Sequence, residues 1–286
     1  MGVLVSCSKP EWEIVMIPDT QYIPLNHDGS AELYTIMNWI ANNAVSRNIK
    51  LVIHVGDVVS IDGGSYVDRQ LGDASGAFAV LDTANIPYLI SVGNHDYYNG
   101  SWADWTEYFP VTRFSGKPWY GGRYTGHSDN DNLYFLMTMD SKDYIIVALS
   151  YAPDTAERTW AHDAFDSYST RVGILVSHAY LQSDGSYNPD SIHTDISDVC
   201  PNVLFSLSGH VSGAQKQQVH PVNGRNIYDQ MRGHVTGEGN YDGYIRILHF
   251  IPATGMVNMT TYSPVLDNWL TDAPNQFSWN VGIGAI

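Results

Sequence analysis

The sequence predicts an α/β fold built on a sheet whose first strands run parallel. Apolar runs typical of buried strands alternate with helical patterns through the first hundred residues, the order that builds a parallel sheet. Five apolar runs along the chain also end in residues of the types that bind metals. In open α/β sheets, ligands bind just outside the carboxyl ends of the strands. We therefore expect one polar cluster and metal-dependent chemistry.

The five strand ends are spread over most of the chain. Asp19 follows the run 13–17, Asp57 follows 51–55, Asn94 and His95 follow 88–92, His178 follows 172–176, and His210 follows 203–207. Taken singly, an Asp or Asn at a strand end is by default a turn former or a helix cap. A single histidine is more often a core or surface residue than a ligand. Five such ends in one fold favour a shared metal centre over five separate explanations.

Two helices are expected between the first three strands. Ser30 is placed to cap the first, in which five apolar residues recur at helical spacing to face the sheet. These residues are Leu33, Ile36, Met37, Ile40 and Ala44. The second helix spans 66–84 and returns to the strand at Tyr88. The strand ends at Asp19, Asp57 and 93–96 should then lie side by side.

The remainder of the chain predicts more strands around one further helix. Segment 97–131 is rich in aromatic residues and glycine, and we expect a long ordered loop with a short helix there. Strands follow at 133–139 and 144–149, then a helix at 155–165. From Asn226 onward the pattern is mostly β. The runs 244–248 and 256–262 are typical of a closing antiparallel pair that turns at 253–255.

The length and net charge of the chain narrow the classes of protein to which it can belong. A chain of 286 residues with 44% hydrophobic content can bury one large core, so we expect a single domain over 11–286 behind a tail at 1–10. The net charge of −16, from 30 acidic and 14 basic residues, argues against binding of long nucleic acid, because that affinity depends on Lys and Arg. The oligomeric state is left open.

The first residues include a short run that resembles a targeting signal. Leu4-Val5-Ser6-Cys7 resembles a bacterial lipobox, the cleavage and lipidation signal that precedes an exported domain. No charged or long apolar region stands before it, so the alternatives are a remnant of a signal and a chance match. We expect an exported protein, whether periplasmic, lipid-anchored or secreted, with a cytoplasmic one as the alternative. No run of about 18 apolar residues predicts a transmembrane helix.

Several short motifs occur in a recognisable order. The motifs Asp19-Thr20-Gln21, Gly56-Asp57, Gly93-Asn94-His95-Asp96, His178 and Gly209-His210 resemble the motif series of calcineurin-like metallophosphoesterases. Asp19-Thr20-Gln21 and the runs 119–122, 177–185 and 261–264 resemble one bacterial branch of that superfamily, in which Gln replaces the usual first-motif His. The resemblance covers most of the chain. It implies a four-layer α-β-β-α sandwich of two mixed sheets flanked by helices, with the metal centre at the carboxyl ends of the strands.

The resemblance also implies a set of metal ligands. Asp57 would bridge two ions, and Asn94, His178 and His210 would complete one site, suited to zinc, manganese or iron. Asp19 and Gln21 would belong to the other site. There the family pattern has a His in place of Gln21 and another two residues beyond His210, where this chain has Ser212.

The loss of two imidazoles leaves the second site with mainly oxygen donors. We expect it to hold manganese, magnesium or calcium weakly. The alternatives are rescue by His234 or His220, and an enzyme with a single ion. The expected cofactor is thus one or two divalent metal ions. His54 lies inside its strand and is expected to support the ligands rather than to bind metal.

The implied function is the hydrolysis of small phosphomonoesters or phosphodiesters by a metal-activated hydroxide. His95 would act as general acid, held by Asp96. Tyr97, Arg123 and Tyr180 are the candidates for contact with the small phosphorylated substrate. A degenerate binding module with the same fold is the alternative, and a nuclease is disfavoured by the net charge of −16. Retention of His95 and of the Asn94, His178 and His210 set favours the enzyme.

Overall fold

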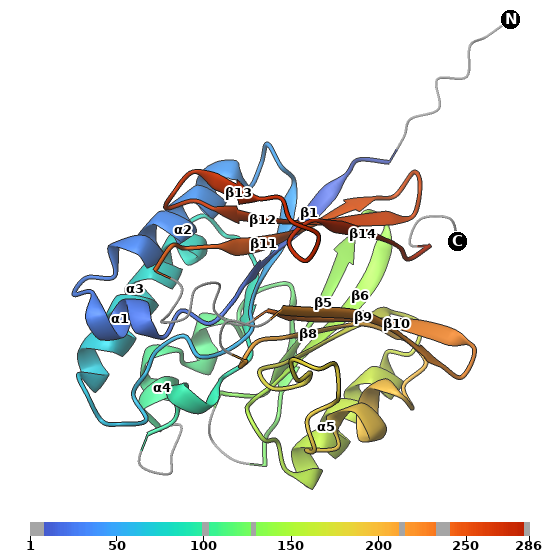
Figure 1. Ribbon diagram of the computed structural model, residues 1–286. Helices are drawn as coiled ribbons and strands as arrows, with labels where there is room; N and C mark the ends of the chain where they lie inside the picture. The colour runs from blue at the N-terminus through green and yellow to red at the C-terminus, as the bar shows by residue number, and fades with distance from the viewer. Residues whose placement is uncertain (1–8, 99–102, 127–129, 212–214, 233–240, 283–286) are drawn as a thin grey trace, which may run out of the picture.

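Two β-sheets lie face to face, with helices on their outer sides (Figure 1). The computed structural model describes residues 9–98, 103–126, 130–211, 215–232 and 241–282. This architecture is the α-β-β-α sandwich that the sequence predicts. None of the helices in these ranges combines the length and the apolar character needed to cross a membrane.

The first sheet holds the early strands and the closing strands of the chain. Its order is β13-β12-β11-β1-β2-β3, with β14 beside β12. The strands are β1 (Trp12–Ile17), β2 (Ile49–His54), β3 (Tyr88–Ile90), β11 (Ile245–Ile251), β12 (Met256–Ser263), β13 (Asn268–Leu270) and β14 (Phe277–Asn280). Strands β1, β2 and β3 pair in parallel, as expected, and β11 runs antiparallel to both β1 and β12. The sheet is therefore mixed.

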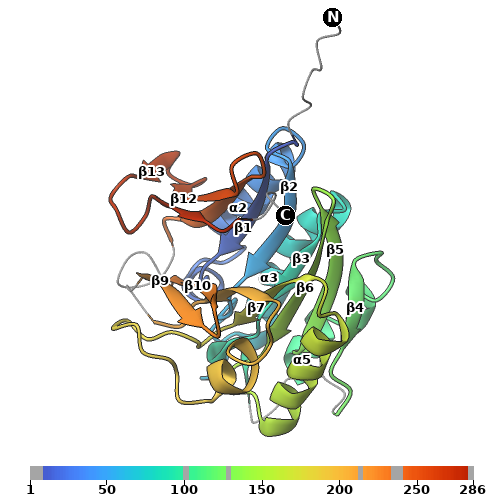
Figure 2. The same ribbon diagram turned by 90° about the vertical axis from the view of Figure 1, so that its right-hand side faces the viewer.

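The second sheet is formed by the middle of the chain. Its order is β4-β5-β6-β7-β8-β10-β9. The strands are β4 (Tyr120–Arg123), β5 (Leu133–Met139), β6 (Lys142–Leu149), β7 (Val172–Ser177), β8 (Val203–Ser208), β9 (Gln215–Val222) and β10 (Arg225–Arg232). Strands β6, β7 and β8 pair in parallel, while β4 lies at an outer edge (Figure 2). The ends of β7 and β8 thus lie next to each other.

Five α-helices and three short helical turns complete the described part of the chain. They are α1 (Tyr22–Asn26), α2 (Ala31–Asn43), α3 (Val67–Thr83), α4 (Ala103–Tyr108), α5 (Thr155–Ser167), η1 (Asn94–Asp96), η2 (Val111–Arg113) and η3 (His193–Ser197). Helices α2 and α3 cover the first sheet and α5 covers the second (Figure 1). The η1 turn begins shortly after β3, so it lies where the first sheet meets the predicted site.

The alternation of side chains along β6 divides the core in two. Tyr144, Ile146 and Ala148 point between the sheets and join the main hydrophobic cluster, which also contains residues of α2 and α3. Ile145, Val147 and Leu149 point the other way and pack with residues of α5. A strand that is buried on both faces reads as a continuous apolar run, which is why the sequence shows it clearly.

The helix predictions are confirmed in position but not in every detail. Leu33, Ile36, Met37 and Ile40 are the buried residues of α2. The prediction that the Ser30 side chain caps this helix is wrong. Ser30 has a left-handed backbone (φ 46°), and its hydroxyl lies 3.5 Å from Asp73 Oδ2 on α3 instead of bonding the helix backbone.

Candidate metal centre

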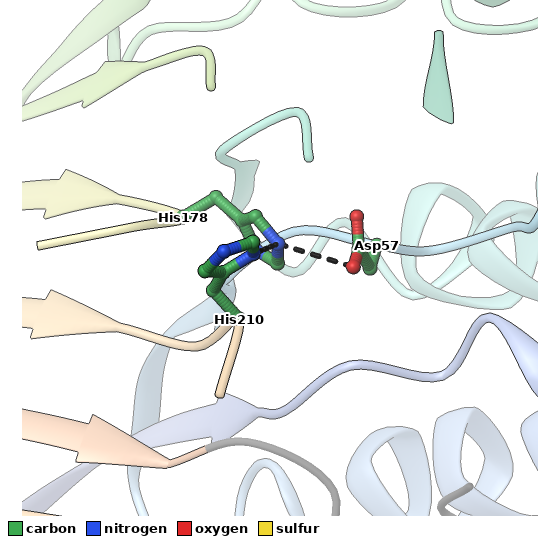
Figure 3. A group of neighbouring side chains, drawn as sticks. All are labelled: Asp57, His178 and His210. Carbon is green, nitrogen blue, oxygen red and sulfur yellow. Dashed lines mark hydrogen bonds and ion pairs between the residues drawn. The ribbon is translucent and has the colours of Figure 1, made fainter. Parts of the chain in front are cut away.

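Three of the predicted ligands converge in one buried group. His178 Nε2 lies 3.1 Å from Asp57 Oδ2 and 3.2 Å from His210 Nδ1. One ligand atom from each residue lies within 4.8 Å of the other two. Figure 3 shows the two imidazoles next to each other and facing the Asp57 carboxylate. One carboxylate and two imidazoles at such distances form a donor set suited to a transition metal.

His178 is held with one nitrogen facing the cluster. Its Nδ1 lies 2.8 Å from the carbonyl oxygen of Val55, which can only accept a hydrogen bond. Nδ1 therefore carries the proton, and Nε2 is the atom that faces Asp57 and His210. Histidines that bind metals commonly donate their other ring N–H to a backbone carbonyl in this way.

The glycines that precede the ligands make room for them. A Cβ atom on Gly56 would overlap the His178 ring and stand 2.8 Å from Ser91 O. A Cβ on Gly93 would overlap Asp57. The same addition at Gly209 would overlap Asp19 Oδ1. Each glycine thus permits the close approach of a ligand from another strand end.

Two of the ligand residues have unusual backbone conformations. Asp57 (φ 52°) and His210 (φ 73°) lie in the left-handed region, and Gly56 before Asp57 has φ 104°. Residues other than glycine enter this region at a cost of about 1–3 kcal/mol, and they cluster at functional sites. The side chains of both residues face His178 (Figure 3).

Asp19 and Asn94 bring further oxygen atoms to the centre. Asp19 is fully buried, and its Oδ1 accepts a hydrogen bond from the His210 backbone N–H at 3.3 Å. Within the described ranges, Asp19 Oδ2 and Asn94 Oδ1 are buried and accept no hydrogen bond. Buried oxygens of this kind are costly unless they are paired or coordinate a metal ion. These residues therefore fit divalent cations.

The charges in the centre support the same interpretation. Burial raises the pKa of Asp19 to about 8, and burial together with the charge of Asp57 raises that of Asp96 to about 7. Burial opposes the charged form of His178, but Asp57 and a hydrogen bond to it raise the His178 pKa to about 9. Burial and the charge of His178 lower the pKa of His210 to about 4. A divalent ion at these residues would favour the ionised form of the carboxylates. His178 would bind the ion through an Nε2 that has lost its proton.

The residues of the second predicted site are only partly described. Gln21 is 2% exposed and follows Asp19 by two residues, at the start of α1. Ser212 and His234 lie outside the described residues. His220, named as a possible substitute ligand, lies on β9 with its Nε2 3.2 Å from Asp198 Oδ1. The structure therefore gives no support to the alternative in which His220 completes the site.

His95 lies beside the centre but is not held as predicted. Its backbone N–H donates to Asp57 Oδ1 at 3.0 Å, and its side chain is 30% exposed. Its Nδ1 lies 2.9 Å from Asp62 Oδ1, at ion-pair distance but without hydrogen-bond alignment. Asp96 instead accepts backbone hydrogen bonds from Val59 and Gly93, at 2.9 and 2.8 Å. Asp96 fixes the loop, and the carboxylate that faces His95 belongs to Asp62.

His54 supports the centre from inside β2, as predicted. Its Nδ1 accepts a hydrogen bond from the Gly56 N–H at 3.2 Å, so its proton is on Nε2. Nε2 lies 3.0 Å from Thr20 Oγ1, which donates in turn to Val58 O at 3.1 Å. Burial lowers the pKa of His54 to about 3, and the ring is neutral. This chain of bonds links the loop of Asp57 to the loop of Asp19.

The three predicted substrate contacts lie in different surroundings. Tyr97 directly follows η1 and is partly exposed beside the centre. Arg123 ends β4, at the carboxyl edge of the sheet but three strands from β7, or about 14 Å at the usual strand spacing. The prediction for Tyr180 is wrong. Tyr180 is 2% exposed, belongs to the cluster beneath α5, and its hydroxyl lies 2.6 Å from Ser197 Oγ.

Sequence reasoning missed an aromatic residue at the centre. The Tyr151 ring lies 5.3 Å from the His210 ring and 6.1 Å from the His178 ring, measured between centroids. Tyr151 follows the end of β6, which runs parallel to β7. The signal was available, because a sixth predicted strand ends just before it.

The order of these strand ends agrees with comparison to known proteins. A family model described as calcineurin-like phosphoesterase matches residues 13–212. The chain belongs to this family. Membership supports metal-dependent hydrolysis of phosphate esters in general. The chain is also 31% identical over 267 residues to the uncharacterized protein YvnB of Bacillus subtilis (strain 168). The match covers 90% of this chain and 20% of that protein, so the chain spans about a fifth of its relative.

Solved structures show the same fold at low identity. A dimetal phosphatase from Danio rerio has a TM-score of 0.62 and 11% identity, over 93% of this chain and 98% of that one. A purple acid phosphatase from yellow lupin has a TM-score of 0.57 and 13% identity, over 94% and 54%. GAP50, described as the anchor in the inner membrane complex of Plasmodium, has a TM-score of 0.53 and 11% identity, over 93% and 89%.

Proposed function

We propose that this calcineurin-like phosphoesterase hydrolyses small phosphomonoesters or phosphodiesters at the centre formed by Asp57, His178 and His210. The observation that carries the proposal is the convergence of these three side chains within 4.8 Å. The buried oxygens of Asp19 and Asn94 add to it, because they lack hydrogen bonds in the described part of the chain. A fold maintained only for binding would gain nothing from leaving such groups buried without partners.

The side chains of the centre would have different roles in the proposed hydrolysis. Divalent ions, when bound, would screen the charge of the phosphate and lower the pKa of a water molecule. Asp57 and His178 would hold an ion in a fixed position, because Val55 and the backbone of His95 fix both side chains. His95 would give a proton to the leaving oxygen, with Asp62 orienting its ring.

The donor atoms set the choice of metal. We expect zinc, manganese or iron with Asn94, His178 and His210, because imidazole nitrogen suits these ions. Asp19 and Gln21 offer oxygen donors, which suit manganese, magnesium or calcium. Asp57 would belong to both sites.

The substrate is expected to be small. A net charge of −16 repels long polyanions, whereas a single phosphate group can be neutralised by the metal centre itself. Of the predicted substrate contacts, Tyr97 is the one closest along the chain to His95, the proposed general acid. Arg123 would contact only the distal part of a substrate, because it lies three strands from β7.

Two aryl phosphates test this function. We expect turnover of p-nitrophenyl phosphate, bis(p-nitrophenyl) phosphate or both when manganese is added. Asp57→Asn should lower the turnover at least about a hundredfold, because it removes a charged ligand without a large change of shape. Asp28→Asn makes the same change on an exposed side chain and should leave the turnover unchanged. Activity that survives Asp57→Asn would contradict the proposed site.

A non-catalytic binding module is the alternative outcome. The fold also occurs in a protein described as an anchor. Absence of turnover of both esters with zinc, manganese, iron, magnesium and calcium would favour that role.

We further propose that the protein is exported, because Leu4-Val5-Ser6-Cys7 resembles a lipobox. Residues 1–8 lie outside the described ranges. Incorporation of labelled lipid that is lost in Cys7→Ser would support lipid anchoring, and a wholly cytoplasmic protein would refute export.

A further inference from the structure

A cavity of about 310 Å³ lies at the end of the second sheet where β6, β7 and β8 begin, whereas the metal centre lies where β7 and β8 end. Lys142 begins β6, Arg171 directly precedes β7, and Val203 begins β8, so the cavity opens at the amino ends of these strands. His178 lies beyond the carboxyl end of β7. A strand of six residues separates the two places by about 20 Å. The cavity is therefore distinct from the proposed catalytic centre.

The charges around this cavity are opposite to those of the whole chain. Lys142, Arg171 and Arg225 line it, and none of its lining residues is acidic. The chain has 30 acidic residues against 14 basic ones. Three of the few basic residues thus share one concave surface. A concave site lined by one sign of charge attracts ligands of the other sign.

The arginines at the cavity are held in place by backbone carbonyls. Arg225 donates to Val203 O at 2.8 Å and to Cys200 O at 2.9 Å. Arg171 donates to Tyr144 O at 3.3 Å, and its ion pair with Asp143 Oδ1 is long, at 3.8 Å. Because its guanidinium is held but only weakly paired, Arg171 can still accept an anion. Planar guanidinium groups match planar carboxylates.

The rest of the cavity wall is largely apolar. Val172, Val203, Leu204, Pro201 and Val281 supply this surface. Small-molecule sites usually combine an apolar wall with a few polar groups and have volumes of about 300–1,000 Å³. Free inorganic ions gain nothing from an apolar wall. An amphipathic anion gains from both parts of the cavity.

We propose that this cavity binds a small organic carboxylate with an apolar body. Arg171 and Lys142 would contact the carboxylate, and the apolar body would lie against Val203 and Leu204. The guanidinium of Arg225 already donates to backbone carbonyls, so we assign the carboxylate to Arg171 and Lys142. The inference is independent of the proposed hydrolysis, since no residue of the metal centre lines the cavity.

Calorimetric titration of the full chain with octanoate tests this inference. We expect saturable binding with one site per chain. Acetate carries the charge without the apolar body, and octan-1-ol has the body without the charge, so both should bind at least tenfold more weakly. Octane-1-sulfonate tests the headgroup and is expected to bind more weakly than octanoate. Absence of saturable octanoate binding, or equal binding of octanol, would overturn the proposal.

Matched variants distinguish the cavity from general binding of amphiphiles. Arg171→Gln and Lys142→Gln should each weaken octanoate binding at least tenfold, and Leu204→Ala should weaken it severalfold. Lys117→Gln removes the same charge far from the cavity, beside Asn85 and Trp119, and should have no effect. Unchanged thermal unfolding of each variant without ligand shows that it folds. Equal binding by Arg171→Gln, Lys142→Gln and Lys117→Gln would refute the site.

A variant of the metal centre distinguishes the proposed hydrolysis from the proposed binding of a carboxylate in the cavity. Asp57→Asn should lower turnover at least about a hundredfold and leave octanoate binding intact. Octanoate binding that disappears with Asp57→Asn, or that requires added metal, would place the carboxylate at the metal centre and overturn the inference about the cavity. Failure of the hydrolysis assay alone would leave the binding result unaffected.

Discussion

Gly93 lies so close to Asp57 that a methyl group on Gly93 would overlap both Oδ1 and the backbone nitrogen of Asp57. The two residues belong to neighbouring strand ends, after β3 and β2. Asp57 Oδ1 also accepts the N–H of His95, two residues beyond Gly93. The loop after β3 is therefore fitted directly onto the carboxylate that would bridge two ions.

Replacement of Gly93 by alanine tests this fit. The added methyl group must displace Asp57 or its own loop, and strain of this kind in a packed site costs about 1–3 kcal/mol of unfolding free energy. We expect Gly93→Ala to lower the melting temperature and to lose tightly bound metal, measured by thermal unfolding and elemental analysis. Gly116→Ala is the control, because a Cβ atom there meets no atom within 4 Å. Normal metal content in Gly93→Ala would contradict this fit.

His95 and Asp62 predict a dependence on the leaving group. If His95 protonates the leaving oxygen, His95→Ala should slow esters of poor leaving groups by about 10²–10⁴-fold and activated aryl esters much less. Asp62→Asn should show the same trend more weakly, because Asp62 acts through the orientation of His95. Rates for a series of aryl phosphates with increasing phenol pKa measure this effect. An equal loss for every ester would indicate that His95 binds the substrate instead.

The strands and their ends were predictable because their signals are local. Strands buried on both faces, such as β6 and β7, give continuous apolar runs. Asp57, His178 and His210 each follow such a run, so the carboxyl edge of the sheets could be expected to gather them. The edge strands β4 and β9 were not predicted, and β13 and β14 were covered only by the general β pattern after Asn226. They are partly exposed, and their formation depends on pairing with distant segments.

The errors concern relationships between loops. Tyr180 and Tyr97 both follow strand ends, yet the chain after His178 folds back in a hairpin bridged by Leu181 and Tyr187, which buries Tyr180. Asp62 faces His95 across two loops, and no periodicity in the sequence links them. Such contacts are set by loop conformation, which apolar patterning does not encode.

The hydrogen bonds of His249 should make the stability of the protein depend on pH. His249 lies on β11 opposite Glu13 near the start of β1, away from the metal centre. Hydrogen bonds to Glu13 and Glu11, at 3.0 and 2.8 Å, raise the pKa of His249 against the opposing effect of burial. Since the folded pKa is raised, this stabilisation is complete below the unfolded pKa of about 6.5 and is lost as the pH rises through the folded value. Arg47, which also pairs with Glu13, stays charged throughout.

The corresponding variant is His249→Gln. Relative to the unchanged chain, it should have a lower melting temperature at pH 5.5, by about 1–3 °C for a partly exposed pair, and a smaller difference at pH 9. His162→Gln, on the exposed side of α5, is the control. A constant difference between the two chains at every pH would mean that the ion pairs of His249 do not contribute.

The two proposed metal sites should differ in how tightly they hold their ions. His178 and His210 would give one site its imidazoles, whereas Asp19 and Gln21 would offer the other only a carboxylate and an amide. We expect elemental analysis after dialysis to find one transition metal per chain, with a second ion that exchanges. Two equally tight zinc ions would refute this difference.

Gln21→His tests the cause of that difference by returning an imidazole to the second site. Because Gln21 is 2% exposed and follows Asp19 by two residues, the new ring would lie in the buried part of the centre. The affinity for the second ion should rise by about 10–100-fold, measured by titration of the dialysed protein with zinc. Gln182→His adds the same ring in the hairpin after β7 and should not change that affinity. If Gln21→His leaves the second ion as weakly bound as before, the missing imidazole is not what makes the site weak.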